Sequence, residues 1–110
     1  MKSFINNIVD PIFATNKEKE NEFWDVEGRL KGGNRPFKFD IRPLKAVDNN
    51  RSEKIGHFKT KSDKIVFEAI DHWVIFDTQE LHEYIESKEK RDFNIEELLN
   101  NLSWNLILHK

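Results

Sequence analysis

Residues 23–42, FWDVEGRLKGGNRPFKFDIR, decide the fold, because apolar and polar side chains alternate along both halves of this stretch. Such alternation is typical of a strand with one buried face. The sequence Gly-Gly-Asn at residues 32–34 separates the halves, and these residue types tolerate the positive φ of tight turns. We therefore expect an antiparallel hairpin. A turn on the two glycines pairs Val26 with Phe39, whereas a turn one residue later pairs Gly28 with Phe39, and both registers bury the same face.

A second β block follows the hairpin. A turn at residues 62–63 places Phe58 opposite Phe67, and a turn at residues 71–72 places Phe67 opposite Phe76. The two pairings bury the same face, and agreement of this kind favours a single arrangement. The block is therefore predicted to form a three-stranded antiparallel meander.

The last third of the chain carries two helix-start signals. Asp77 followed by Glu80, and Asn94 followed by Glu97, both fit the capping box, in which the first side chain caps the helix and the second reaches back. Apolar residues at helical spacing follow each signal. Residues 104–108 alternate again and predict a final strand that returns to the sheet.

The N-terminal segment is expected to contribute one short helix. Asp10–Pro11 ends this helix, because the residue before a proline is pushed out of the helical region. Residues 16–21 are polar and predict a loop. The apolar residues at helical spacing are Phe4, Ile5, Ile8 and Val9.

Together these patterns predict an α+β fold in a single domain, residues 1–110. We expect a mostly antiparallel sheet of five or six strands, formed by the hairpin, the meander and the C-terminal strand. Two C-terminal helices and the short N-terminal helix complete the expected fold.

The composition narrows the class of protein. The chain has 110 residues, of which 37% are hydrophobic and 35% charged, and it has no cysteine. This length suits one hydrophobic core, and the lack of cysteine excludes a disulfide framework and a zinc–thiolate site. No apolar run approaches the ~20 residues that span a bilayer. We therefore expect a soluble, cytoplasmic protein with no membrane partner.

The formal charge of −2 conceals a segregation of charge along the chain. Three basic and six acidic residues give −3 over residues 1–27, eleven and four give +7 over residues 28–64, and four and ten give −6 over residues 65–110. Segments of opposite charge can fold against one another. Alternatively, the basic hairpin, residues 28–45, binds an anion or a nucleic acid. The candidate residues for that binding are Arg29, Lys31, Arg35, Lys38, Arg42 and Lys45.

Catalytic motifs are missing from the sequence. The register of the meander places His57 opposite Glu68, which suits either a proton-transfer pair or an ordinary cross-strand pair. The four histidines lack the spacing of metal ligands, and no serine lies in a glycine-flanked nucleophile turn. We therefore expect a non-enzymatic protein with no metal and no small-molecule cofactor.

Three apolar residues are candidates for contact with a protein partner. They are Ile70, Trp73 and Ile75, which are expected on the sheet face opposite Phe67. Either the first C-terminal helix covers them, or they form an exposed patch that contacts a partner. A small, charge-rich domain without a catalytic motif favours a regulator that binds another protein, of the adaptor, inhibitor or immunity type. The alternative function is nucleic-acid binding through the basic hairpin.

Overall fold

A computed structural model describes residues 3–44, 53–90 and 92–110, and we name its elements in chain order. They are the 3₁₀ helix η1 (Phe4–Asn7), β1 (Ile8–Phe13), α1 (Asn16–Glu22), β2 (Val26–Leu30), β3 (Pro36–Pro43), β4 (Glu53–Lys54), β5 (Lys64–Glu68), β6 (His72–Asp77), α2 (Thr78–Lys88), β7 (Asp92–Phe93), α3 (Ile95–Asn101) and β8 (Asn105–His109).

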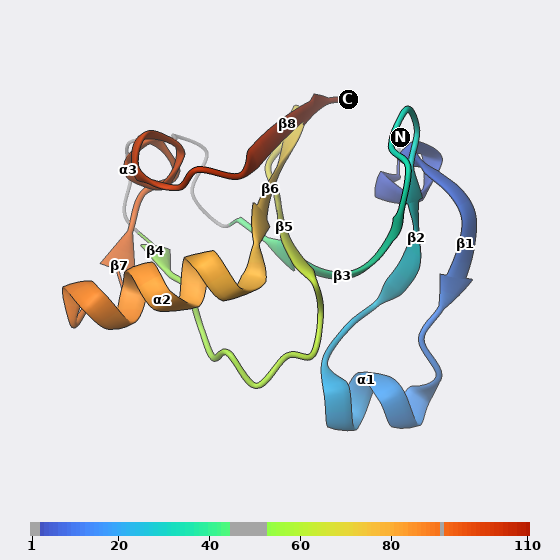
Figure 1. Cartoon of the computed structure of the whole chain (residues 1–110), viewed down its shortest axis with the longest axis horizontal. Helices are drawn as coiled ribbons and strands as arrows, with labels where there is room; N and C mark the ends of the chain where they lie inside the picture. Colours follow the sequence, from blue (N-terminus) through green and yellow to red (C-terminus); the bar gives the residue numbers. More distant parts are fainter. Residues whose placement is uncertain (1–2, 45–52, 91) are drawn as a thin grey trace.

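The main sheet has six strands in the order β1–β2–β3–β5–β6–β8, and β4 pairs with β7 in a separate two-stranded sheet (Figure 1). Neighbouring strands are antiparallel, except that β3 and β5 are parallel. The predicted α+β fold, with a mostly antiparallel sheet and two C-terminal helices, is confirmed. Within the described residues, no helix is long and apolar enough to cross a membrane.

The hairpin adopts the first of the two predicted registers, with Val26 opposite Phe39. The Gly33 N–H donates to the Leu30 carbonyl at 2.8 Å, which closes a turn with Lys31 and Gly32 at its centre. Gly32 has a φ of +82°, a left-handed conformation that costs glycine little and other residues more. The glycine pair therefore decides a register that alternation alone leaves open.

The predicted meander is wrong in its first strand. Residues 56–63 form no strand, and β5 instead runs parallel to β3 with Phe39 opposite Lys64. Side-chain and backbone hydrogen bonds hold this segment against the residues that follow α1. Thr60 Oγ1 donates to the Phe23 carbonyl at 3.2 Å, and the Lys61 N–H donates to a carbonyl at the end of α1 at 2.7 Å. Because these contacts are distant in sequence, alternation does not reveal them.

Strands β5 and β6 do form a hairpin, but its register differs by two residues from the prediction. Phe67 lies opposite Val74, and the turn is closed by the Ala69 N–H, which donates to the His72 carbonyl at 2.9 Å. The predicted His57–Glu68 pair does not form, because His57 lies in the segment before β5. The buried face is unchanged, since a shift of two residues keeps each side chain on its side.

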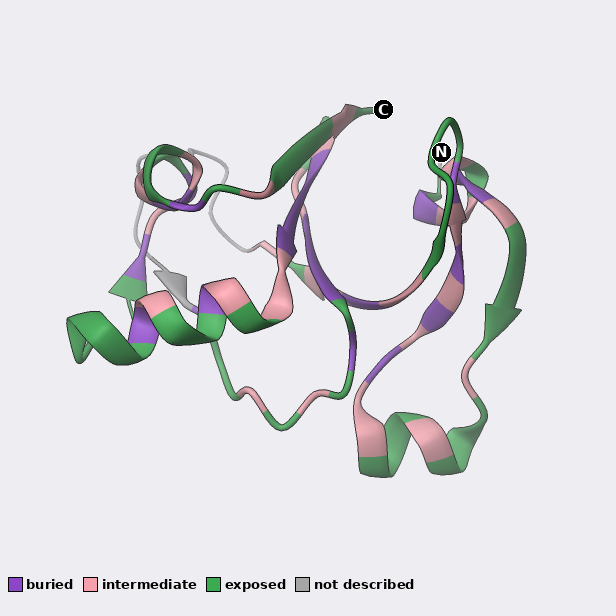
Figure 2. Cartoon of the chain, in the orientation of Figure 1, coloured by how far each residue is buried: buried purple, intermediate pink, exposed green. Residues whose placement is uncertain are grey.

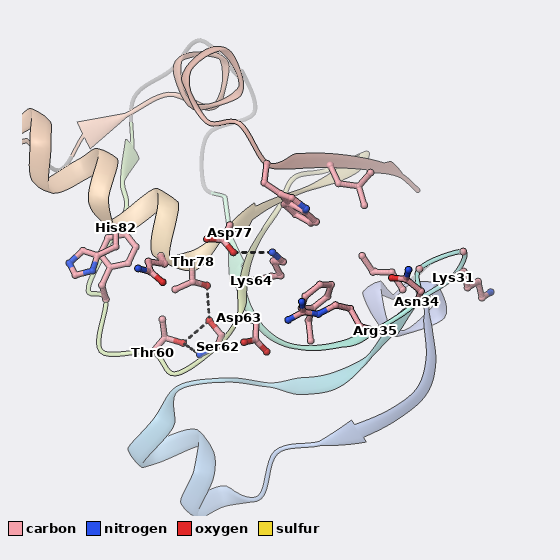
Figure 3. A pocket seen from close by; sticks show the side chains of 18 residues that line it. Lys31, Asn34, Arg35, Thr60, Ser62, Asp63, Lys64, Asp77, Thr78 and His82 are labelled. Carbon is pink, nitrogen blue, oxygen red and sulfur yellow. Dashed lines mark hydrogen bonds and ion pairs between the residues drawn. The ribbon is translucent and has the colours of Figure 1, made fainter.

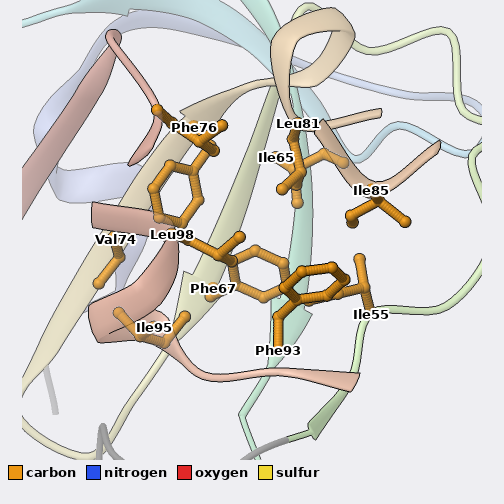
Figure 4. Close-up of a cluster of buried hydrophobic side chains, with 11 residues drawn as sticks. Ile55, Ile65, Phe67, Val74, Phe76, Leu81, Ile85, Phe93, Ile95 and Leu98 are labelled. Atoms are coloured by element: carbon orange, nitrogen blue, oxygen red, sulfur yellow. The ribbon is translucent and has the colours of Figure 1, made fainter. Parts of the chain in front are cut away.

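The sheet is strongly curved, so that β8 and the β1–β2 arm face one another across an open side (Figure 1). Helices α2 and α3 lie against the convex face, and η1 lies inside the curve. The buried residues of the sheet are therefore concentrated in its central strands (Figure 2). The convex core is drawn in Figure 4 and contains Ile55, Ile65, Phe67, Val74, Phe76, Leu81, Ile85, Phe93, Ile95, Leu98 and Leu102. The concave core contains Phe4, Ile8, Val26, Leu30, Phe39, Val66, Trp73 and Ile75.

The expected partner patch is not an exposed surface. Trp73 and Ile75 belong to the concave core, where Trp73 is 1% exposed and packs edge-on against Phe4. Their cover comes from η1 and the curvature of the sheet, and not from α2, which packs on the opposite face. Ile70 alone is exposed, in the turn between β5 and β6.

The N-terminal segment differs from the prediction in two places. The helical spacing yields only the short η1, and the chain then continues as β1. The polar stretch expected to be a loop is the helix α1. Thr15 Oγ1 accepts from the Glu18 N–H at 3.1 Å, and Glu18 Oε1 accepts from the Thr15 N–H at 3.0 Å. This capping box was visible in the sequence as Thr-x-x-Glu, and it stabilises a helix that has no buried residue.

Gly28 sets how closely β1 approaches β2. A Cβ at this position would lie 2.2 Å from Ile8 Cγ2, and no side chain tolerates such a contact. We expect Gly28→Ala to lower the free energy of unfolding by about 2 kcal/mol, because β1 must shift outward. The matched variant Gly32→Ala meets no atom within 4 Å and should cost about 1 kcal/mol through its positive φ. Urea unfolding of both variants checks the order, and an equal loss would contradict the close packing of β1.

Candidate functional site

A groove of about 950 Å³ opens at one end of the concave face (Figure 3). It lies between the tip of the β2–β3 hairpin, the segment before β5, the start of α2 and the start of β8. Its lining residues are Leu30, Lys31, Gly32, Gly33, Asn34, Arg35, Phe37, Phe58, Thr60, Ser62, Asp63, Lys64, Asp77, Thr78, Gln79, His82, Trp104 and Leu106.

An ion pair between a buried lysine and a partly exposed aspartate forms the floor of the groove. Lys64 is 6% exposed, and its Nζ lies 3.0 Å from Asp77 Oδ1. The same ammonium lies 3.9 Å from the ring centroid of Trp104 and 4.6 Å from that of Phe37, within range of cation–π attraction. The Lys64 side chain thus joins β5, β6, β3 and the start of β8 at one point.

Asp77 serves the floor and the helix at once. Its second carboxylate oxygen, Oδ2, accepts from the Glu80 N–H at 3.0 Å, which confirms the predicted cap of α2. Burial alone would raise the pKa of Asp77, but the hydrogen bonds from the Glu80 N–H and from Lys64 hold the pKa below its usual value. The negative charge of the Asp77 carboxylate is therefore already balanced by the Lys64 ammonium and by the N–H group at the start of α2.

Two cations stand at the rim of the groove without an acidic partner. Lys31 and Arg35, here called the rim cations, form no ion pair within the described residues. The Arg35 guanidinium carbon lies 5.0 Å from the ring centroid of Phe37. The nearest acidic wall residue, Asp63, is already engaged, because its Oδ2 accepts from the Lys38 N–H at 2.8 Å. The rim is therefore positively charged and offers donors to an anionic group.

One wall of the groove is a chain of hydroxyl groups. Thr60 Oγ1 lies 2.9 Å from Ser62 Oγ, and Ser62 Oγ lies 3.2 Å from Thr78 Oγ1. The lining also includes apolar side chains, among them Phe37 and Leu106. A bound molecule would thus meet cations, hydroxyl groups and aromatic rings.

The other described cations of the basic hairpin do not line the groove. Arg29 donates to the Gly33 carbonyl at 2.8 Å, and Lys38 Nζ lies 5.0 Å from the ring centroid of Trp24. Lys45 falls outside the described residues. The predicted residues therefore do not form one continuous basic stripe.

Arg42 has a structural position that the sequence does not reveal. Its guanidinium donates to Asp40 Oδ2 at 2.8 Å. It also donates to the carbonyl oxygens of Ile55 and His57, both at 2.9 Å. Arg42 thereby attaches the segment before β5 to β3, with four of its five N–H groups engaged in these hydrogen bonds.

No family model, curated protein or solved structure matches this chain. Across residues 3–44, 53–90 and 92–110, no group of three or more His, Asp or Glu residues is placed to hold a metal ion.

Sequence reasoning found the rim cations but missed the floor and walls of the groove. Lys64 and Trp104 carry no local signal, since their contact depends on the pairing of β6 with both β5 and β8. Thr78 and Ser62 meet only in the folded chain. The one available hint was Asp77, whose predicted cap fixes the start of α2 beside the groove.

Glu80 does not close a capping box but links α2 to the start of β8. Its carboxylate accepts from the Ser103 N–H at 2.9 Å, from the Ser103 hydroxyl, and from the Trp104 N–H at 3.0 Å. The hydrogen bond from the Ser103 hydroxyl, followed by that from the Trp104 N–H, lowers the pKa of Glu80. Glu80 therefore holds Trp104 in place at the wall of the groove.

We expect Glu80→Gln to lower the free energy of unfolding by about 1 kcal/mol at pH 7, a value discounted for solvent exposure. Because the pKa of Glu80 is lowered in the folded state, its contribution is full above the ordinary carboxyl range and is lost as the pH falls through the folded pKa. The difference between wild type and variant should therefore shrink in urea unfolding at pH 3. A difference that stays constant from pH 7 to pH 3 would rule out this role for the carboxylate.

Proposed function

We propose that this chain is a non-enzymatic protein-binding module that takes an acidic, extended segment of a partner protein into the groove. The observation that carries the proposal is the pair of rim cations: Lys31 and Arg35 form no ion pair among the described residues, and the Arg35 guanidinium lies over the ring of Phe37. A module of this kind acts as an adaptor or an inhibitor, because it occupies a segment of another protein without changing it.

The groove favours a particular side-chain pattern in the segment. Alternate side chains of an extended chain point to the same side. An Asp or Glu side chain that reaches the rim cations would therefore be followed, two positions later, by an apolar side chain against Trp104 and Leu106. Backbone groups of the segment would face the hydroxyl wall at Thr60 and Thr78. The expected pattern is an acidic residue, any residue, and an apolar residue.

Nucleic-acid binding has less support from the same surface. A nucleic acid needs several free cations along its backbone. Arg42 is occupied by Asp40 and by backbone carbonyls, and the hairpin carries Phe39 inside the concave core instead of on a stacking surface.

Selection of a random displayed peptide library on the immobilised full chain tests the proposal. We expect the enriched peptides to carry the acidic–any–apolar pattern and to lose enrichment when the double variant Lys31→Glu/Arg35→Glu replaces the wild type. Enrichment without acidic residues would contradict the proposal. Displacement of the peptides by a short single-stranded DNA at equal concentration would contradict the proposal and would favour a nucleic acid as the ligand of the groove.

A further inference from the structure

Strand β8 is an outer strand of the sheet, and in the described part of the chain only β6 pairs with it. The Lys110 N–H donates to the Asp71 carbonyl at 3.0 Å, which shows which residues point toward β6. Hydrogen bonding alternates along an antiparallel pair, so the backbone groups of Leu106 and Leu108 also face β6. The backbone groups at the open edge belong to the alternate residues, Asn105, Ile107 and His109.

The other outer strand, β1, carries features that interrupt pairing. Its register shifts between Val9 and Ile12, and Asp10 within the shift has a φ of +53°. Pro11 also lacks an N–H. Bulges and prolines are common devices that prevent a sheet edge from pairing with another chain. Strand β8 contains neither a proline nor a bulge against β6.

The side chains of β8 are also unusual for this chain. Leu98 to His109 is the longest run without Asp, Glu, Lys or Arg in a sequence that is 35% charged. Leu106 is 36% exposed and Ile107 is 40% exposed. An uncharged, partly exposed apolar edge is a surface for strand pairing, because nothing repels an approaching strand.

We propose that β8 pairs antiparallel with β8 of a second copy of the chain, about a two-fold axis at Ile107. In this register Ile107 faces Ile107 of the second copy, Leu106 faces Leu108, and Asn105 faces His109. The sequence Asn-Leu-Ile-Leu-His is symmetric in character about its centre, so apolar side chains meet apolar side chains and no like charges meet. This self-complementarity selects a second copy as the occupant, as an isologous two-fold contact requires.

The dimer goes beyond the proposed peptide binding and adds to it. Leu106 lines the groove as well as the edge strand, so Leu108 of the second copy lies beside the groove of the first. Two grooves therefore stand near one axis, and a partner with two acidic segments binds both at once with increased avidity. Dimerisation needs no peptide, and peptide binding needs no dimer, so each claim fails separately.

Sedimentation equilibrium of the full chain without peptide, from about 1 µM to about 1 mM, tests the pairing. A single five-residue strand pair is a small interface, so we expect reversible association to twice the chain mass. The Ile107→Lys and Ile107→Glu variants should each weaken association at least tenfold, since like charges then meet at the axis. An equal mixture of the two variants should restore the dimer, because Lys then faces Glu.

The Ile70→Lys variant is the matched control, because Ile70 is an exposed isoleucine in the turn before β6, outside the proposed contact. It should dimerise as the wild type does. A wild type that stays monomeric up to 1 mM would overturn the proposal. Dimerisation of both single variants at wild-type strength, or a variant mixture that stays monomeric, would also overturn it.

Discussion

Asp77→Ala is expected to lower the free energy of unfolding by about 3 kcal/mol, which is among the largest losses for a single side chain outside the apolar cores. Two interactions are lost together. Lys64 keeps its buried ammonium but loses its carboxylate partner, and an uncompensated buried charge costs about 3–5 kcal/mol. The cap of α2 on the Glu80 N–H is lost as well, at about 1 kcal/mol. We take the lower end because Asp77 is about one-third exposed, with a relative side-chain exposure of 34%.

Two further variants separate these causes. Asp77→Asn retains a side-chain oxygen that can cap α2, so it should lose mainly the ion pair. Lys64→Met removes the buried charge, so adding Asp77→Ala to Lys64→Met should cost only the cap. Urea unfolding at pH 7 gives the four free energies. Additive losses in the double variant, or a loss below 1 kcal/mol for Asp77→Ala, would show that the pair does not organise the groove floor.

The pH dependence of the same pair has a definite sign. The pKa of Asp77 is lower in the folded chain than in the unfolded chain. Its stabilisation is therefore present at neutral pH and is lost in acid, as the pH falls through the folded pKa. In unfolding measurements below the ordinary carboxyl range, the difference between wild type and Asp77→Asn should decrease.

The second large effect concerns binding. The double variant Lys31→Glu/Arg35→Glu should weaken the affinity for an acidic peptide of the selected pattern about 100-fold. Each rim cation supplies one charge-assisted hydrogen bond of about 1.5 kcal/mol, and 1.4 kcal/mol corresponds to a factor of ten. Reversal also adds repulsion, so 100-fold is a lower expectation. Isothermal titration of each single variant and of the double variant measures the effect.

Lys17→Glu is the matched control for this charge reversal. Lys17 is exposed on α1 and does not line the groove, and its reversal changes the net charge of the protein as each single reversal does. Its affinity should stay within about twofold of the wild type. Wild-type binding should also weaken as the salt concentration rises, because the rim is open to solvent. Equal losses in Lys17→Glu and Arg35→Glu would mean that net charge alone decides affinity.

Local patterns predicted those parts of the fold that short segments determine. Alternation and the glycine turn predict the β2–β3 hairpin, and the caps at Asp77 and Asn94 predict α2 and α3. Each depends on residues within about four positions of one another or on a single two-residue turn. The same reasoning could have found α1, whose Thr15–Glu18 box is just as local.

Long-range contacts account for what the sequence did not predict. The parallel pairing of β3 with β5 depends on Arg42 and Thr60, which hold the intervening segment through bonds to backbone groups far along the chain. Alternation gives the same pattern for a parallel and an antiparallel neighbour. The covering of Trp73 by η1 likewise follows from the curvature of the sheet, which no local pattern records.

The candidate site was predictable at its rim and not on its floor. Lys31 and Arg35 are in the basic hairpin, whose charge is visible in the sequence. Lys64 looked like one more surface cation, yet it is buried between two rings and a carboxylate. The sequence around a charged residue at the start of an apolar strand does not show whether its side chain will be buried or exposed, because the partner that decides this lies on a different element.

Amide NMR of the isotopically labelled full chain, titrated with the selected acidic peptide, tests the central claim most directly. We predict that the largest shifts fall on the amides of Gly32 and Gly33 and on the Trp104 indole N–H, which border the groove. Residues 16–19, at the start of α1, should not move, since none of them lines the groove. Shifts centred on α1 or β1, or a spectrum unchanged at a peptide concentration of about 1 mM, would contradict the assignment of the groove as the binding site.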